Sequence, residues 1–142
     1  MTLARTFAVP PDLAEAVIAK CSETVLRGLE TAPGVTLDEL IDDVKAKRAV
    51  LWLILEGQEP LATALTEIVH EDDTKYVAVF GLGGAQMWKW ARTFAQTVSD
   101  YARDEGCERV RFAGSKAWAR VVPHCHRVGT RDGEDIWERA VQ

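Results

Sequence analysis

The sequence predicts an α/β fold of the α+β kind, with a mixed central sheet flanked by helices in the order α-α-β-β-β-α-β-α-β. Three observations predict it. Two segments with helical periodicity lie within residues 1–48, and three short apolar runs separated by turn residues follow over 49–80. Residues 76–112 then have the order strand, glycine-rich stretch, amphipathic helix, strand. The chain has 142 residues, of which 47% are hydrophobic. We therefore expect a single domain over 1–142, with helices in 1–48 and the sheet in 49–142.

Two helices are expected first. Pro10, Pro11 and Asp12 form a helix-start signal, and apolar residues recur at helical spacing over 13–29. A break at 31–34 ends this helix. Thr36, with a glutamate three residues later, resembles a capping box that opens a second helix.

Three strands are expected next. Residues 49–55 form a continuous apolar run, and 61–70 and 75–80 are the two strands that follow. The turn residues at 57–60 and 71–74 leave only short links between them. Short links predict an antiparallel meander.

A long helix should follow a glycine turn at 81–84. Its apolar residues lie three and four apart, so one stripe faces the sheet, and Gly106 ends the helix with a positive φ. The stripe consists of Met87, Trp90, Ala91, Phe94, Ala95, Val98, Tyr101 and Ala102.

The last elements are a strand at 108–113, a short helical piece at 116–125 and a strand at 135–141, reached through a turn at 129–133. Because a helix joins the strands at 75–80 and 108–113, these two are expected to be parallel neighbours.

Composition limits the function. The net charge is −5 and the basic residues form no run, which disfavours nucleic-acid binding. The cysteines, Cys21, Cys107 and Cys125, are odd in number and widely spaced, as expected of reduced thiols. The longest apolar run is too short to span a bilayer, and the N-terminus lacks a signal-peptide core. We expect a cytoplasmic protein without membrane partners, unless it is packaged into a particle.

The element order and the segment Tyr101-Ala-x-x-x-Gly106 resemble the GNAT acyl-CoA N-acyltransferases. In that family the long helix opens with Gln/Arg-x-x-Gly-x-Gly/Ala, and the spacing from Tyr101 places Gln86, Lys89 and Ala91 on the three signature positions. The resemblance implies acetyl-CoA as cofactor and a cofactor cleft in the 49–142 half, and we expect no metal. The cofactor-binding candidates are Phe80, Gly81, Gly83, Gly84, Gln86, Lys89 and Ala91.

Lys89 departs from the signature glycine. A phosphate-binding helix start works because unpaired N–H groups face the anion, and a glycine lets the pyrophosphate approach the backbone. The long side chain of Lys89 should obstruct that approach, although its ammonium could supply a compensating charge. On the simpler interpretation, the glycines at 81–84 only form a strand-to-helix turn.

The catalytic positions also depart from the family pattern. Alignment puts Pro123 where many members carry a tyrosine acid, so His124 is the remaining candidate acid, or only a surface histidine. The candidate base is Glu67 or Glu56, unless both are solvated rim carboxylates. His124, Cys125 and His126 are too close in sequence for all to face one metal ion.

Within the family, the resemblance is closest to small GNAT-like proteins of tailed bacteriophages, some of which are virion proteins. Trp88, Trp90 and Trp118 lie in segments that border the family's cofactor cleft, and we expect at least one to be partly exposed and to meet a protein partner, either a second copy or another phage component. Two hypotheses follow. The favoured one is a catalytically degenerate, virion-associated structural or binding component in the host cytoplasm or the virion; the alternative is an active acetyl-CoA-dependent N-acetyltransferase.

Overall fold

The computed structural model describes residues 4–30, 34–84, 86–114, 116–131 and 133–141. Its strands form one sheet in the order β1-β2-β3-β4-β5-β7-β6, and every neighbouring pair is antiparallel except β4 and β5. The strands are β1 Ala4–Ala8, β2 Val50–Glu56, β3 Glu59–Glu71, β4 Thr74–Gly84, β5 Arg109–Ala113, β6 His126–Arg131 and β7 Glu134–Ala140. This architecture confirms the predicted fold class.

The parallel pair is the one expected from the sequence. Residues 76–79 of β4 lie in register with 109–112 of β5, and α4 (Met87–Asp104) connects the two strands. The meander of β2, β3 and β4 is also as predicted. Thr36 caps α3 (Leu37–Lys45) by accepting a hydrogen bond from the Glu39 N–H at 3.2 Å, as the capping box indicates.

The first predicted helix is wrong in detail, because it is broken into three pieces. A 3-10 turn, η1 (Pro11–Leu13), leads into α1 (Ala14–Lys20), and α2 (Ser22–Leu29) follows after a break at Cys21, where ψ is 25°. The helical hydrogen bonds continue across the break, since Cys21 N–H donates to Val17 and the Cys21 carbonyl accepts from Val25. The helical spacing of apolar residues therefore continues through the break, so the sequence pattern does not indicate it.

The prediction also missed β1 and β6. Both are edge strands with largely exposed side chains, so neither has the apolar alternation that marks a half-buried strand. The C-terminal helix is shorter than expected, because α5 spans only Ala117–Val121 and β6 begins at His126.

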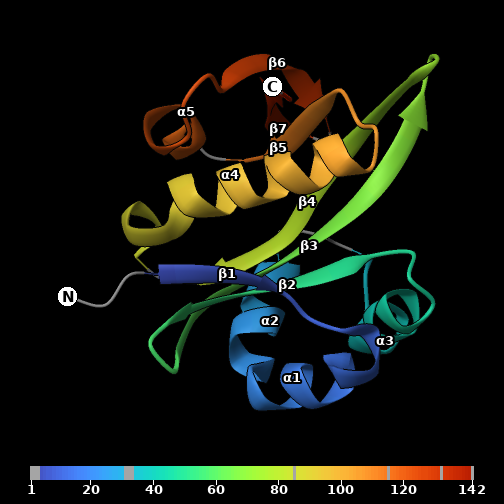
Figure 1. Ribbon diagram of the computed structural model, residues 1–142, viewed down its shortest axis with the longest axis vertical. Coiled ribbons are helices and arrows are strands. Elements are labelled where there is room, and N and C mark those ends of the chain that lie inside the picture. The colour runs from blue at the N-terminus through green and yellow to red at the C-terminus, as the bar shows by residue number, and fades with distance from the viewer. Residues whose placement is uncertain (1–3, 31–33, 85, 115, 132, 142) are drawn as a thin grey trace.

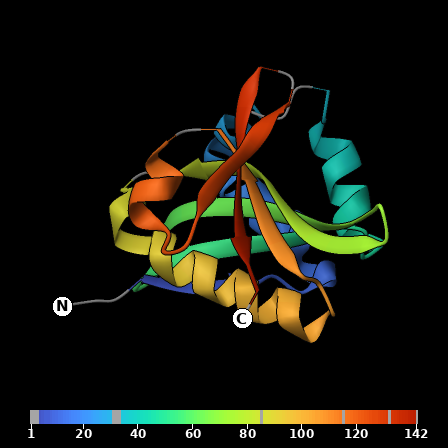
Figure 2. The same ribbon diagram turned by 90° about the horizontal axis from the view of Figure 1, so that it is seen from above.

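Helices cover both faces of the sheet, and two hydrophobic layers result. Helices α1, α2 and α3 cover one face, and α4 and α5 cover the other (Figures 1 and 2). Trp52, Val77 and Phe112 of the sheet pack toward α4, whereas Leu51 and Leu65 pack toward the N-terminal helices. Within the described residues, no helix is long and apolar enough to cross a membrane.

The glycines at 81–84 belong to β4 and do not form the predicted turn. A Cβ added to Gly83 would lie 2.6 Å from the backbone nitrogen of Gly28 in α2, and one added to Gly28 would lie 2.8 Å from the carbonyl carbon of Gly81. Real Cβ atoms do not approach backbone so closely. The glycines of α2 and β4 therefore allow the helix backbone to rest directly on the strand backbone.

Candidate functional site

Strands β4 and β5 diverge beyond Val79 and Phe112, the last pair in parallel register. At the same point the pairing of β4 with β3 shifts register between Thr63 and Leu65, and Gly81 has a φ of +58°. This is the geometry of a β-bulge, which bends a strand and redirects it. The bulge thus opens a gap on the side of β4 that faces β5.

The end of β5 is held on the opposite side of this gap. The Gly114 N–H donates to the carbonyl of Asp135 at 2.9 Å, and the Trp137 indole N–H donates to the Gly114 carbonyl at 3.0 Å. Both bonds tie the end of β5 to β7. Because the two strands are held by different neighbours, the gap between them is a fixed feature of the sheet.

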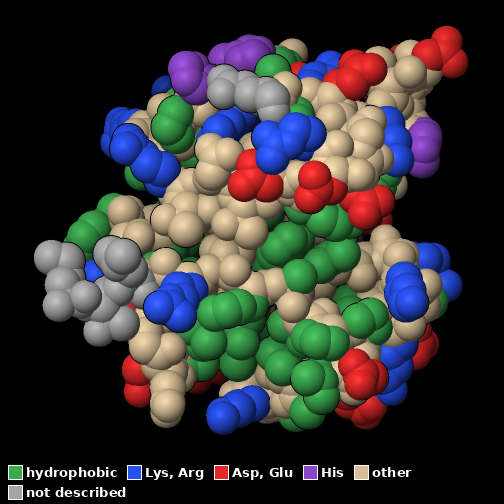
Figure 3. Space-filling view, viewed as in Figure 1, with side chains coloured by type: hydrophobic (Ala, Val, Ile, Leu, Met, Phe, Trp, Pro, Cys, Tyr) green, Lys and Arg blue, Asp and Glu red, His purple; other side chains and the backbone are tan. Residues whose placement is uncertain are grey.

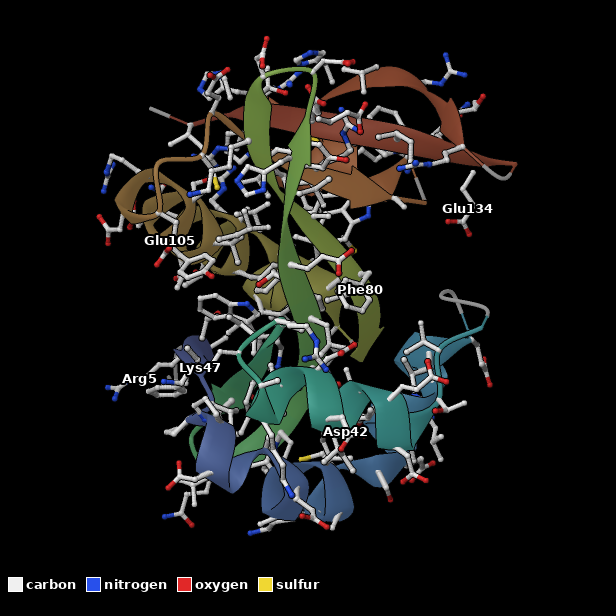
Figure 4. The ribbon with its side chains drawn as sticks, turned by 90° about the vertical axis from the view of Figure 1, so that its right-hand side faces the viewer. Arg5, Asp42, Lys47, Phe80, Glu105 and Glu134 are labelled. Atoms are coloured by element: carbon white, nitrogen blue, oxygen red, sulfur yellow. The ribbon has the colours of Figure 1, made fainter. Side chains whose placement is uncertain are left out.

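The gap holds a cavity of about 230 Å³. In Figure 4, Phe80 on β4 and Glu134 at the start of β7 lie on two sides of this region. Glu134 is the one acidic residue in the described lining, and it is half-buried. The lining residues are Val79, Phe80, Gly81, Leu82, Met87, Ala113, Gly114, Trp118 and Glu134.

Helix α4 begins beside the cavity, with Met87 in the lining. Gln86 occupies the N-cap position in the left-handed conformation and makes no side-chain cap bond, and the first turn contains no acidic residue. The Lys89 N–H turns back to the Gln86 carbonyl at 2.9 Å. A helix start without a capping carboxylate keeps its positive end available to an anion.

Lys89 points away from the cavity. Its ammonium lies 3.2 Å from a carboxylate oxygen of Glu56 at the end of β2, and 5.6 Å from the ring centre of Trp88. The side chain is absent from the described cavity lining. The obstruction expected from the sequence therefore requires Lys89 to leave Glu56.

The other predicted cofactor residues divide into two groups. Phe80 and Gly81 line the cavity. Ala91 is fully buried on the core-facing side of α4. Gly83 and Gly84 are needed for packing, because Cβ atoms there would meet the backbone of α2 and of β3 respectively. Gln86 is exposed at the helix start.

Neither predicted catalytic residue lines the cavity. Glu67 is exposed on β3 opposite Ala78, and His124 is exposed at a φ of 63° between α5 and β6. The structure therefore does not bring the two side chains together in the cleft. Glu56, the alternative base, is paired with Lys89.

Sequence reasoning missed Glu134 and Met87, and it treated Trp118 only as part of a segment near the cleft. Trp118 is buried against Phe112, with ring centres 4.5 Å apart. Glu134 directly follows the predicted turn at 129–133 and lies next to Gly133, and nothing in this local sequence indicates a catalytic residue. Only the three-dimensional pairing of β7 with β5 brings it beside β4.

The thiols offer no nucleophile for this site. Burial raises the pKa of Cys125 to about 11, with Arg139 acting in the opposite direction, and burial also raises the pKa values of Cys21 and Cys107. All three are therefore protonated near neutral pH. Among the described residues, no group of three or more His, Cys, Asp or Glu side chains is placed to hold a metal ion.

Comparison by sequence gives no relatives: no family model and no curated protein matches the chain. Comparison by structure gives many. A probable acetyltransferase from Staphylococcus epidermidis is 11% identical, with a TM-score of 0.72 over 99% of this chain and 100% of that one. The PaiA N-acetyltransferase from Thermoplasma acidophilum, solved in complex with coenzyme A, is 8% identical, with a TM-score of 0.65 over 96% of this chain and 98% of that one.

A predicted acetyltransferase from Clostridium acetobutylicum, solved with acetyl-CoA, is 10% identical, with a TM-score of 0.59 over 84% of this chain and 86% of that one. Identities this low establish the fold alone. The chain has the GNAT acetyltransferase fold, and proteins of this fold include complexes with coenzyme A and with acetyl-CoA.

Proposed function

We propose that this protein binds an acyl-CoA in the cleft between β4 and β5 and transfers the acyl group to an amine. The observation that carries the proposal is the divergence of β4 and β5, the parallel strand pair of the described sheet, directly beside the uncapped start of α4. The thioester would lie against the bulged segment of β4, and the pyrophosphate would face the helix start. The ion pair between Lys89 and Glu56 leaves that approach open.

The transfer needs a group that removes a proton from the amine. Glu134 is suited to this role, because its carboxylate lines the cleft and makes no hydrogen bond or ion pair with another described residue. The amine nitrogen bonds to the acyl carbon, the carbon–sulfur bond breaks, and Glu134 takes the amine proton. No tyrosine, histidine or cysteine is among the described lining residues, so solvent would protonate the departing thiolate.

Calorimetric titration with acetyl-CoA, together with release of free thiol in the presence of an amine, tests the proposal. We expect Glu134→Gln to lower turnover by about a hundredfold while acetyl-CoA still binds. The same substitution at Glu67, the base predicted from the sequence, should change turnover little. If Glu67→Gln abolishes turnover and Glu134→Gln does not, the assignment of the base is wrong.

A second candidate function is a non-catalytic, protein-binding component. It is favoured by the lack of a Tyr, His or Cys proton donor for the thiolate among the described cleft residues, and by Trp88, which is 74% exposed. The exposure confirms the expectation that one of the three tryptophans is accessible, whereas Trp90 and Trp118 are buried. Burial of Trp88 against a second copy or a phage component, and a place in a virion, stay predictions that rest on the sequence resemblance.

Two measurements separate the candidates. If the chain is a binding component, Trp88→Ala should weaken assembly by about 2 kcal/mol while the monomer stays folded, as judged by light scattering and circular dichroism. In that case acetyl-CoA binds weakly or not at all, and Lys89→Gly strengthens binding. Binding of acetyl-CoA by the native chain at low micromolar concentration would instead support the enzyme.

A further inference from the structure

A second hollow lies at the other end of α4 from the cleft. Strand β2 begins at Val50, which pairs with Thr66, but β3 continues to Glu71, so one corner of the sheet has no β2 residue beside it. The C-terminal half of α4 passes over this corner. The hollow has a volume of about 490 Å³, within the usual range for small-molecule sites, and shares no described lining residue with the cleft.

The hollow is largely apolar. Val9 lines it from the link after β1, Pro11 from the start of η1, and Val44 from α3. Val50 and Ile68 line it from the sheet, and Tyr101 lines it from α4. In Figure 3 hydrophobic side chains gather between α4 and the β1 side of the molecule. The Tyr101 ring is held edge-on to Trp52, with ring centres 5.4 Å apart.

Three polar side chains at the hollow, of which Lys47 and Glu105 are exposed, have no hydrogen-bond or ion-pair partner among the described residues. Lys47, which follows α3, and Glu105, which follows α4, lie on opposite sides of the hollow (Figure 4). Neither side chain forms an ion pair or hydrogen bond with the other or with any other described residue, and the Tyr101 hydroxyl forms no hydrogen bond within the same set. Burial is the main cause of a raised pKa at Tyr101, with Glu105 contributing, so this hydroxyl remains a donor.

The position of Lys47 is unusual for a lysine. The Lys47 N–H donates to Val44 and the Arg48 N–H to Asp43, at 3.1 and 2.8 Å, which is the Schellman arrangement that ends α3. Its left-handed residue is most often glycine, yet Lys47 occupies it with a φ of 63°. The backbone would be easier to form with glycine, so the turn itself does not explain the lysine.

We propose that this hollow binds a free amino acid with an apolar side chain. The side chain would lie among Val9, Val44 and Ile68, the carboxylate would accept from Lys47 and Tyr101, and the ammonium would face Glu105. One cation and one anion at the rim favour a dipolar ligand. A simple carboxylate would leave Glu105 beside a like charge with no cation to pair with, and a simple amine would do the same to Lys47. The hollow is separate from the cleft, so binding does not depend on acyl transfer.

Thermal-shift and calorimetric titrations test the ligand class. L-leucine and L-phenylalanine should raise the melting temperature in a saturable way at millimolar concentration. Isocaproate, which lacks the ammonium group, and isopentylamine, which lacks the carboxylate, should bind at least about tenfold more weakly than leucine. Equal binding of isocaproate would show that only an apolar carboxylate is recognised and would overturn the proposal, as would no saturable binding of either amino acid.

Three variants test the location. Lys47→Gly should keep or raise the melting temperature and yet weaken amino-acid binding at least about tenfold. Ala8→Phe should fill the hollow, because Ala8 lies in its lining and on the same face of the sheet as Trp52, its partner on β2. Arg5→Phe is the matched control, because Arg5 is exposed on the opposite face of β1. Binding unchanged by both Lys47→Gly and Ala8→Phe would place the ligand elsewhere and refute the proposal.

Discussion

The two faces of β4 meet their helices by different means. On one face, α4 packs through large side chains, with Trp90 and Phe94 buried edge-to-face at 6.0 Å between ring centres. On the other face, α2 packs through glycines, and Gly28 lies against Gly81 and Gly83. The first contact depends on side-chain volume, and the second depends on the absence of side chains.

This difference changes the meaning of the glycine run. Glycines between a strand and a helix indicate a turn or a phosphate loop, but here Gly83 is required by the close approach of α2. Gly81 has two roles, because its backbone faces α2 and its positive φ forms the bulge that opens the cleft. The packing of the N-terminal helices and the shape of the cleft are therefore linked through one strand.

The largest effect is expected where α2 meets β4. Gly83→Val should lower the free energy of unfolding by about 4 kcal/mol, because the new side chain would overlap backbone atoms that cannot move independently. Denaturant unfolding measures the change. Gly129→Ala is the control, since no atom lies within 4 Å of a Cβ added there, and it should change stability by less than about 0.5 kcal/mol. A mild effect of Gly83→Val would mean that α2 can withdraw from β4.

On the α4 face, Phe94→Ala should lower the free energy of unfolding by about 3 kcal/mol, because it removes a fully buried ring and leaves a cavity. Phe94→Leu should recover part of the loss, in contrast to Gly83, where no larger residue is tolerated. Chemical denaturation of the two variants tests this difference between volume and close approach.

A smaller effect is expected at the buried hydrogen bond of the same face. The Trp52 indole N–H donates to the Thr66 hydroxyl at 2.8 Å. Thr66→Val keeps the shape but leaves the N–H without an acceptor, which should cost about 2 kcal/mol of stability. Thr66→Ser retains the hydroxyl and should lose less; if the two variants are equally stable, the hydrogen bond contributes nothing.

The smallest effect concerns Cys125, which packs against the α4-side core. With its pKa raised to about 11, the folded thiol stays protonated where an unfolded one ionises. Stability should therefore fall as the pH rises from about 9 toward 11, and alkylation at pH 8 should be roughly a hundredfold slower than for a free thiol. Cys125→Ser should remove the contribution of this thiol to the pH dependence of stability. Rapid alkylation of Cys125 in the native protein at pH 8 would contradict the raised pKa.

Periodicity predicted the elements that bury one face. The meander, α4 and the parallel pair were predicted correctly because each has a continuous apolar pattern, and Thr36 signalled the start of α3 by a local cap. β1 and β6 were missed because edge strands with exposed side chains carry no such pattern. The break at Cys21 was hidden because the apolar period runs through it.

The candidate site was predicted only in part. Phe80 and Gly81, predicted as cofactor-binding residues from the family resemblance, line the cavity between β4 and β5, and their role in binding stays a prediction. Glu134 was not found, because its place beside β4 depends on β7 pairing with β5, a contact between distant parts of the chain. The orientation of Lys89 was also beyond the sequence, since nothing local indicates Glu56 as its partner.

The short parallel register has a consequence for how the protein opens. The meander of β2, β3 and β4 and the antiparallel set of β5, β7 and β6 are each formed by one continuous stretch of chain, and the backbone ladder that joins them covers residues 76–79 and 109–112. We expect amide hydrogen exchange to reveal two cooperative units with this ladder as their boundary. The cleft lies at that boundary, where the chain can part locally without unfolding either unit.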